Sequence, residues 1–322
     1  MSSVETKMRP AFAGRIRRSR KPEDQTGIAS LNGRWAYLFT APFFILFFIF
    51  GLLPVIYSVY IAFFSWDPLD PTAQTFVGLE NFRILWDDGN FWLAVRNTFQ
   101  IWFISTIPQI FLAIALASVL RNPTLRGNTL WRTVLLIPNI TSVLAVALVF
   151  GQLFGRDYGL INFVITRFGF DNVDFVEQAI PGQIAISVMI MWRWVGYNTL
   201  IFLASMLAIP NELYESAAID GVTRWQQFRY ITLPQLKNTI TFVLIVGTIG
   251  GLQVFAEPLT LAGATGGSSR QVSTLTLYLF EQAFVNINWG YGAAIGIAIT
   301  IIVLIISTIN FFITRALGSE DK

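Results

Sequence analysis

The chain alternates between long apolar runs and shorter polar segments. Each apolar run is close to 20 residues or longer, which is the length that an α-helix needs to cross the hydrocarbon core of a bilayer. The runs predict six membrane-spanning helices, at 36–64, 97–120, 132–154, 181–207, 238–261 and 290–314. The expected fold class is all-α and polytopic, because a β-barrel would show short alternating segments instead.

Composition supports this interpretation. A soluble domain averages about 25% charged residues, whereas this chain has 13% charged and 54% hydrophobic residues. Its ten Trp residues gather near the ends of the apolar runs, as interfacial anchors do. We therefore expect a multi-pass helical membrane protein, with the lipid bilayer as its surroundings.

The distribution of Lys and Arg orients the spans. These residues number eight in 1–35, three in 121–132, three in 208–237 and two after residue 314. The alternate loops together hold only five, and Arg193, the last of the 22, lies inside the fourth span. Because cytoplasmic loops carry the excess of positive charge, both termini and the loop 208–237 are predicted to lie in the cytoplasm.

The two ends of the chain are polar. Residues 1–35 are basic and lack apolar periodicity, so we expect a disordered cytoplasmic arm that fixes topology rather than a nucleic-acid-binding tail. A cleaved signal peptide is not expected, because the first apolar run starts late and is too long. Residues 315–322 are predicted to form a cytoplasmic tail.

Several kinds of chemistry are excluded by what the chain lacks. It has no Cys and no His, so no disulfide, no Cys or His metal site and no Ser–His triad can form. No Gly-Lys pair occurs, so there is no Walker A phosphate loop. The chain is not expected to be an enzyme or to bind metal or another cofactor, and any ATP it uses must be held by a partner.

The cytoplasmic loop 208–237 is charged and centred on a turn. Gly221 can adopt the left-handed conformation that stops a helix. Thr223 followed by Gln226 is typical of a capping box at the start of a second helix, and Pro234 is expected to end that helix before the next span. The loop therefore predicts a helix, a glycine turn and a second helix.

Residue size within this loop suggests a contact. Ser216, Ala217 and Ala218 are small enough to let another backbone approach, and Trp225 and Phe228 are large apolar side chains on a charged segment. Exposed apolar side chains of this kind mark protein contacts. The alternative is a re-entrant or surface-lying helix pair that only seats the bundle on the membrane.

The same loop carries a family pattern. Glu215-Ser216-Ala217-Ala218, then Asp220-Gly221, then Ile231, Leu233 and Pro234 resemble the EAA loop of permease subunits of binding-protein-dependent ABC importers. In that family the loop forms a coupling helix that sits in a cleft of a cytoplasmic ATPase. Ser216 departs from the pattern, which has Ala there. The resemblance implies ATPase-coupling roles for Glu215, Ala217, Ala218, Asp220, Gly221, Trp225, Phe228 and Pro234.

The resemblance extends over nearly the whole chain. Similar stretches of carbohydrate-type permeases, the group that contains the maltose and glycerol-phosphate systems, match 76–85, 91–98, 135–154, 158–165 and 203–221. It implies a second homologous permease, two ATPase copies that bind ATP and Mg, and an extracytoplasmic sugar-binding protein. The implied substrate is a di- or oligosaccharide, with glycerol phosphate or a polyol left open.

Membrane-buried polar residues indicate where the substrate would pass. In the fourth span Arg193 and Tyr197 are four residues apart and share a face, with Trp192 and Gly196 in the adjacent row. Aromatic faces beside hydrogen-bonding groups suit a sugar ring. The resemblance also implies sugar contacts in this span and the next, so Trp192, Arg193, Gly196 and Tyr197 are predicted to line the path.

The fifth span contains a second pair of polar residues. Gln253 and Glu257 are four residues apart, and Pro258 is expected to break or kink the helix just after Glu257. Both are predicted to line the substrate path. Arg193 has an alternative interpretation as a structural charge, for which Glu257 is the candidate partner.

The outer loops are acidic. Their carboxylates are Asp67, Asp70, Glu80, Asp87, Asp88, Asp157, Asp171, Asp174 and Glu177. They form either a solvated face or a docking surface for the extracytoplasmic protein, and charge alone does not decide between the two.

Two other functional classes fit the sequence less well. A self-sufficient ion-coupled transporter or channel predicts mid-membrane carboxylates and often inverted repeats, yet Glu257 is the one clear candidate and no repeat is evident. That class also leaves the loop 208–237 unexplained. An integral-membrane enzyme would need a nucleophile–base or metal constellation, which the sequence lacks.

Overall fold

The computed structural model describes residues 26–66 and 74–316, with side chains for 37–66 and 74–312. Its contacts divide the chain into two compact units, Met1–Ile56 and Tyr57–Lys322, which are considered separately. Most of the predicted arm 1–35 lies outside the described residues, as does most of the tail 315–322. Helix α1 nevertheless begins at Thr26, ten residues before the predicted start of the first span.

The described part of the first unit is one helical segment. It consists of α1 (Thr26–Phe47), a π-helical turn (Phe48–Leu52) and the start of α2 (Leu53–Ile61). Over residues 37–56, large apolar side chains, including Phe44, Phe50 and Val55, are exposed. A helix that is hydrophobic on every side needs lipid or another protein around it, which fits the predicted first span.

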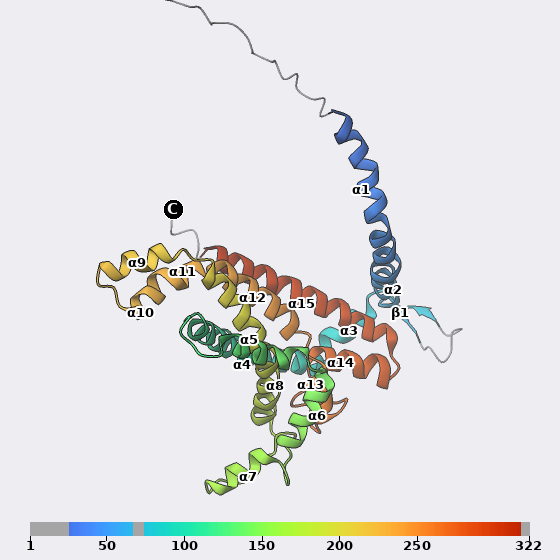
Figure 1. Ribbon diagram of the computed structural model, residues 1–322. Helices are drawn as coiled ribbons and strands as arrows, with labels where there is room; N and C mark the ends of the chain where they lie inside the picture. The colour runs from blue at the N-terminus through green and yellow to red at the C-terminus, as the bar shows by residue number, and fades with distance from the viewer. Residues whose placement is uncertain (1–25, 67–73, 317–322) are drawn as a thin grey trace, which may run out of the picture. The chain divides into compact units, whose positions relative to one another are not determined.

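The second unit is built on long helices (Figure 1). Helix α4 (Gly89–Leu120) packs along α8 (Ala179–Leu207), and α12 (Lys237–Gly251) packs against α4 and α15 (Trp289–Ala316). The apolar core between α4, α8 and the start of α12 includes Ile110, Ala113, Phe202, Met206, Leu236 and Val243. Packing among small and branched side chains of this kind holds helices together where lipid replaces water outside.

The first outer loop adds the fold's strands. Strands β1 (Phe64–Ser65) and β2 (Thr75–Phe76) pair in antiparallel register, so the prediction of a purely helical fold is corrected by one short hairpin. The buried Asn81 of α3 (Glu80–Asp87) donates hydrogen bonds to the carbonyls of Ala62 and Phe64, at 2.8 and 3.0 Å. The side-chain amide of Asn81 therefore holds α3 against the first strand of the hairpin.

The predicted span 132–154 is not one continuous helix. Helices α5 (Asn128–Ile140) and α6 (Val143–Leu153) meet at 92°, with Thr141 and Ser142 in non-helical backbone between them. The Thr141 hydroxyl donates to the carbonyl of Ile137 at 2.8 Å, which satisfies a group that the end of the helix leaves free. The Thr141 hydroxyl thus lowers the cost of interrupting the helix within an apolar segment.

The predicted span 238–261 is also interrupted, but at another place than expected. Helix α12 ends at Gly251 and α13 (Ala256–Ala262) follows at an angle of 42°. The break therefore precedes Glu257 instead of following it. Pro258 lies in the first turn of α13, where a missing N–H costs nothing because no helical partner exists there.

Among the described residues, four helices are long and apolar enough to cross a membrane, and the two bent pairs raise the number to six if each forms one span. Two further helical segments lie in the predicted outer loops. They are α7 (Leu160–Arg167) and α14 (Leu275–Phe280), the latter continued by a π-helical turn (Glu281–Val285).

Candidate functional site

The loop between the fourth and fifth predicted spans folds as a helix, a glycine turn and a helix. Helix α9 (Asn211–Ile219) ends where Gly221 adopts φ +75°, and α10 (Arg224–Gln227) follows. The N–H of Val222 donates to the carbonyl of Ala217 at 3.0 Å, and that of Gly221 donates to the carbonyl of Ala218 at 3.1 Å. These two bonds form a Schellman motif, which requires a left-handed residue and so explains the glycine.

The second helix starts as its sequence predicts and then differs. Thr223 and Gln226 form the predicted capping box, in which the Thr223 N–H donates to Oε1 of Gln226 at 2.8 Å. Beyond it, however, a π-helical turn (Phe228–Thr232) leads into α11 (Leu233–Gln235), so Pro234 does not end the helical path. The wider π turn precedes the proline, whose nitrogen can form no hydrogen bond.

The loop exposes large apolar side chains. Ile219 is 87% exposed and Trp225 is 71% exposed, and the Trp225 ring stacks on Phe228 at 5.6 Å between centroids. Phe228 itself is half-buried against the core below, so it shares the contact face only in part. Of the other predicted coupling residues, Glu215, Ala218, Asp220, Gly221 and Pro234 are exposed and Ala217 is half-buried.

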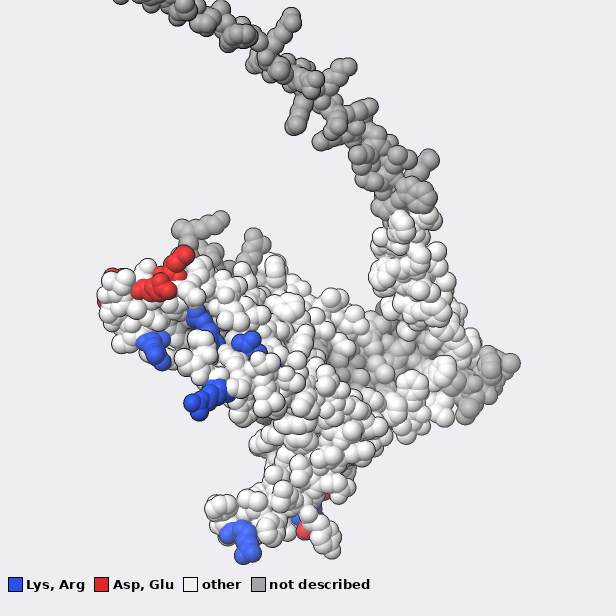
Figure 2. All heavy atoms as spheres, in the orientation of Figure 1, with Lys and Arg blue, Asp and Glu red and all other residues white. Residues whose placement is uncertain are grey.

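On the face of the second unit shown in Figure 2, exposed charged side chains lie at two ends. The coloured atoms gather over α9 and the neighbouring segments and again near α7, and the surface between them is white. An uncharged surface between two charged ends is what a bilayer requires of a spanning domain.

A cavity of about 510 Å³ lies at the break between α12 and α13. Its size falls within the range of small-molecule sites, which is about 300–1,000 Å³. Four of the six residues predicted for the substrate path line it, namely Arg193, Tyr197, Gln253 and Glu257. The cavity therefore brings together side chains from the fourth span and the fifth.

Arg193 and Glu257 meet in this cavity. Nη1 of Arg193 lies 3.2 Å from Oε1 of Glu257, and the two side chains are 16% and 7% exposed. The pairing proposed as the alternative role of Arg193 is therefore confirmed as geometry. Contact of either residue with a substrate stays a prediction.

The remaining two predicted residues lie outside the cavity. Trp192 packs on Phe150 of α6 at 5.5 Å between ring centroids. Gly196 is buried against α5, where an added Cβ would lie 1.7 Å from the carbonyl oxygen of Leu135. Gly196 therefore allows the close approach of two helices, and contact of Trp192 or Gly196 with a substrate stays a prediction.

Sequence reasoning missed several lining residues. Trp194 lines the cavity in place of Trp192, with its ring 5.8 Å from that of Tyr197. Thr106 and Gln109 of α4 also line it, and their spacing of three residues places both on one helix face. Polar residues at helical spacing inside the second span were the signal that could have found them.

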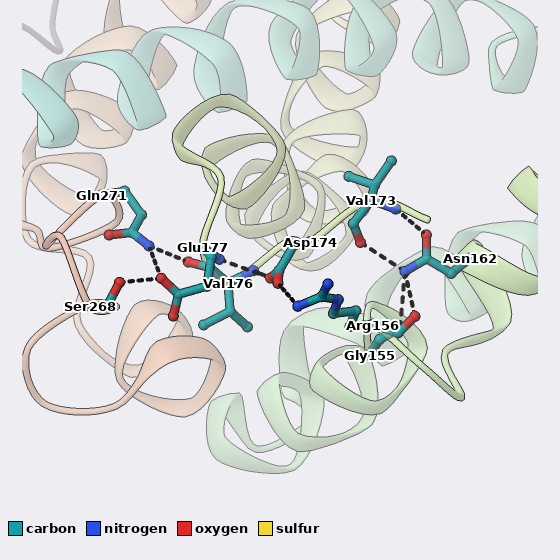
Figure 3. A network of polar contacts seen from close by, with 9 residues as sticks. All are labelled: Gly155, Arg156, Asn162, Val173, Asp174, Val176, Glu177, Ser268 and Gln271. Carbon is teal, nitrogen blue, oxygen red and sulfur yellow. Dashed lines mark hydrogen bonds and ion pairs between the residues drawn. The ribbon is translucent and has the colours of Figure 1, made fainter. Parts of the chain in front are cut away.

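A hydrogen-bonded network ties the outer loops together (Figure 3). The Asn162 amide donates to the carbonyls of Gly155 and Val173, and Nη1 of Arg156 lies 3.0 Å from Oδ2 of Asp174. Gln271, from a loop about 100 residues further along the chain, donates to the carbonyl of Val176 at 2.8 Å. Part of the acidic outer surface is thus engaged within the chain.

A second polar cluster joins the N-terminal ends of α4 and α15 to α14. Asp88 accepts hydrogen bonds from the hydroxyls of Tyr278 and Tyr291. Burial acts to raise the pKa of Asp88, but these bonds and two backbone N–H groups outweigh it and hold the pKa below its ordinary value. Arg270 pairs with Glu281, and the hydrogen bonds to that carboxylate raise the pKa of the guanidinium.

The chain resembles known transport proteins. Residues 101–319 match the family model described as binding-protein-dependent transport system inner membrane component. The lactose transport system permease protein LacF of Rhizobium radiobacter is 33% identical, over 87% of this chain and 93% of the relative. The arabinooligosaccharides transport system permease protein AraP of Bacillus subtilis (strain 168) is 34% identical, over 88% of this chain and 90% of the relative.

A solved structure shares the fold. A chain from the crystal structure of a bacterial ABC transporter involved in the import of the acidic polysaccharide alginate superposes with a TM-score of 0.78. The two chains are 24% identical, and the match covers 91% of this chain and 99% of the other. The same arrangement of helices therefore occurs in a solved transporter.

Proposed function

Since the chain belongs to the family of binding-protein-dependent transport system inner membrane components, we propose that it is one membrane-spanning subunit of an ATP-driven importer of di- or oligosaccharides. The family assigns the chain to the bacterial inner membrane as a multi-pass permease. Relatives that match nearly its whole length carry lactose and arabino-oligosaccharide transport in their names, which supports a sugar as the substrate.

The proposed topology has six spans with both ends in the cytoplasm. It treats α5 with α6 as one bent span and α12 with α13 as another. The excess of Lys and Arg in the termini and alternate loops supports this orientation. The loop 208–237 then faces the cytoplasm, and the loops of Figure 3 face the opposite side.

The loop 208–237 is proposed to be the contact with the ATPase. The observation that carries this function is the exposure of Ile219 and Trp225 at the glycine turn, on a segment that water would otherwise meet. A rigid helix–turn–helix of this kind can enter a cleft in a partner and transmit its movement. The chain has no phosphate loop of its own, so ATP and Mg belong to that partner.

The complete importer is proposed to contain two permeases, two ATPase copies and an extracytoplasmic sugar-binding protein. Closure of the ATPase dimer on ATP would draw the coupling loops together and open the spans outward. The sugar would then pass from the binding protein into the cavity beside Arg193 and Glu257. The exposed apolar helix faces of this chain leave room for a second permease.

A self-sufficient ion-coupled transporter is the alternative. It would need a carboxylate near the middle of the membrane that is free to bind a proton or ion. Glu257, the candidate from sequence, is paired with Arg193 instead. The observed pairing and the family both favour the importer.

The experiment is uptake into proteoliposomes by the purified assembly of both permeases and the ATPase. Radiolabelled lactose, arabinobiose and diacetylchitobiose are supplied outside, with the binding protein, and ATP is enclosed inside. We expect uptake of at least one sugar that requires both ATP and the binding protein, with vesicles lacking either as controls. Uptake by this chain alone, driven by an ion gradient without ATP, would support the alternative.

A further inference from the structure

The cavity contains one cation and one anion among its described lining residues. These are Arg193 of α8 and Glu257 of α13, and they are paired at 3.2 Å with both side chains largely buried. The other lining groups are uncharged. They comprise apolar side chains and the polar residues Thr106, Gln109, Tyr197, Asn198 and Gln253.

Pairing makes the cavity electrically neutral. Away from water, opposite charges at this distance attract strongly, and removing either one leaves the other buried and unpaired. The guanidinium is not fully enclosed, however, because the Arg193 side chain is 16% exposed and lines the cavity. Arg193 could therefore bind a further acceptor, such as a sugar hydroxyl, while it keeps Glu257.

A substrate that carries a carboxylate cannot bind Arg193 in the same way as a neutral sugar. To reach the guanidinium it must lie beside the Glu257 carboxylate or displace it. The first arrangement places two like charges together away from water, and the second leaves Glu257 buried without its partner. Both arrangements cost free energy, whereas binding of an uncharged sugar does not carry this cost. This is selection by an unfavourable contact with the wrong ligand.

We infer that the Arg193–Glu257 pair makes this part of the path select uncharged saccharides over acidic ones, with Glu257 as the excluding residue. The inference rests on the proposed sugar import. The fold itself does not decide the matter, because a transporter of an acidic polysaccharide shares it. The selection must therefore come from side chains, and these two are the charged ones in the cavity.

The test is equilibrium binding to the purified assembly of both permeases and the ATPase in lipid nanodiscs. The binding protein is omitted, so that its own selectivity does not enter. The probes are lactose, arabinobiose and diacetylchitobiose, each paired with the uronate made by oxidising its terminal primary hydroxyl to a carboxylate. Ligand-observed NMR near neutral pH gives the ratio of the two Kd values for each pair.

For the unaltered assembly we expect the neutral sugar to bind more tightly than its uronate by about tenfold or more, which is 1.4 kcal/mol or more. Glu257→Gln should shift the ratio toward the uronate by about tenfold, because the guanidinium then lacks its own carboxylate. Glu257→Asp keeps the charge and should keep the preference. The double variant Arg193→Gln, Glu257→Gln should shift the ratio less than Glu257→Gln does.

Two results would overturn the inference. One is equal or tighter binding of the uronate by the unaltered assembly. The other is an unchanged ratio in Glu257→Gln or, if that variant does not assemble, in the double variant. Failure of the proposed function looks different, because then no sugar of either kind enters the proteoliposomes with ATP and binding protein present.

Discussion

The guanidinium carbon of Arg121 lies 4.0 Å from the centre of the Tyr214 ring. Arg121 caps the C-terminal end of α4, and Tyr214 lies in α9 of the loop 208–237. The Tyr214 hydroxyl is 2.8 Å from Oγ1 of Thr232, in the π-helical turn that leads to α11. One aromatic side chain thus connects α9 to the end of the long helix α4 and to the second half of the loop.

This connection predicts a loss of coupling when it is cut. Tyr214→Phe removes the hydrogen bond to Thr232 and keeps the ring over Arg121, whereas Tyr214→Leu removes both. A cation–π contact is worth about 0.5–2 kcal/mol, so we expect sugar moved per ATP hydrolysed to fall several-fold in Tyr214→Leu and less in Tyr214→Phe. Uptake and phosphate release measured in the same proteoliposomes give the ratio. Equal ratios in the unaltered protein and both variants would show that Tyr214 does not contribute to coupling.

The left-handed turn at Gly221 predicts a substitution effect that depends on backbone conformation. No atom lies within 4 Å of a Cβ added there, so the φ of +75° alone disfavours a side chain. Left-handed backbone costs an ordinary residue about 1–2 kcal/mol. Gly221→Val should therefore reduce ATPase stimulation by loaded binding protein, and Gly221→Asn, which tolerates this conformation, should reduce it less. The reverse order would contradict the structure of the turn.

Close packing at Gly196 predicts a loss of stability. A methyl group there meets the Leu135 carbonyl at 1.7 Å, so α8 and α5 must separate. Overpacking of this kind costs about 1–3 kcal/mol, and Gly196→Ala should lower the Tm of the purified assembly. Gly151→Ala in α6 is the matched control, since nothing lies within 4 Å of its added Cβ. An equal Tm for the two variants would refute the close contact.

The Asp88 cluster predicts a pH-dependent contribution to stability. A carboxyl group whose pKa is lowered by folding contributes fully above its unfolded pKa, and the contribution is lost as pH falls through the lower folded pKa. The ordinary value is 3.8, so the loss occurs below that pH. Asp88→Asn should lower Tm at neutral pH, and its difference from the unaltered protein should shrink in acid. Asp87→Asn, at an exposed neighbour, is the control, and a pH-independent difference for Asp88→Asn would contradict the assignment.

The elements that follow from local patterns were predictable from sequence. Length and hydropathy located the apolar segments, and the Thr223–Gln226 spacing located the start of α10 because a capping box is formed within four residues. Gly221 was placed correctly for the same reason. Each of these features depends on neighbours along the chain.

Features that depend on packing between distant segments were not predictable. The 92° break at Thr141 has no Gly or Pro at its centre. Periodicity placed Arg193 and Tyr197 on one face of a helix, but it could not tell that Trp194 faces the cavity and Trp192 faces α6. Which side of α8 meets which helix is decided by contacts such as Gly196 on Leu135, and these join different parts of the sequence.

The proposed contact between the loop 208–237 and a cytoplasmic ATPase can be tested directly by cross-linking. Because the chain has no Cys, single cysteines can be placed without removing others from it. Ile219→Cys and Tyr158→Cys are matched positions, since both side chains are strongly exposed in the structure and lie on opposite proposed sides of the membrane. The measurement is cross-linking of each cysteine to the ATPase subunit in intact assembled membranes, with a thiol-directed photoreactive reagent. We expect a cross-linked product from Ile219→Cys and none from Tyr158→Cys. No product from Ile219→Cys in an assembly that contains the ATPase, or a product from Tyr158→Cys, would contradict the proposed contact.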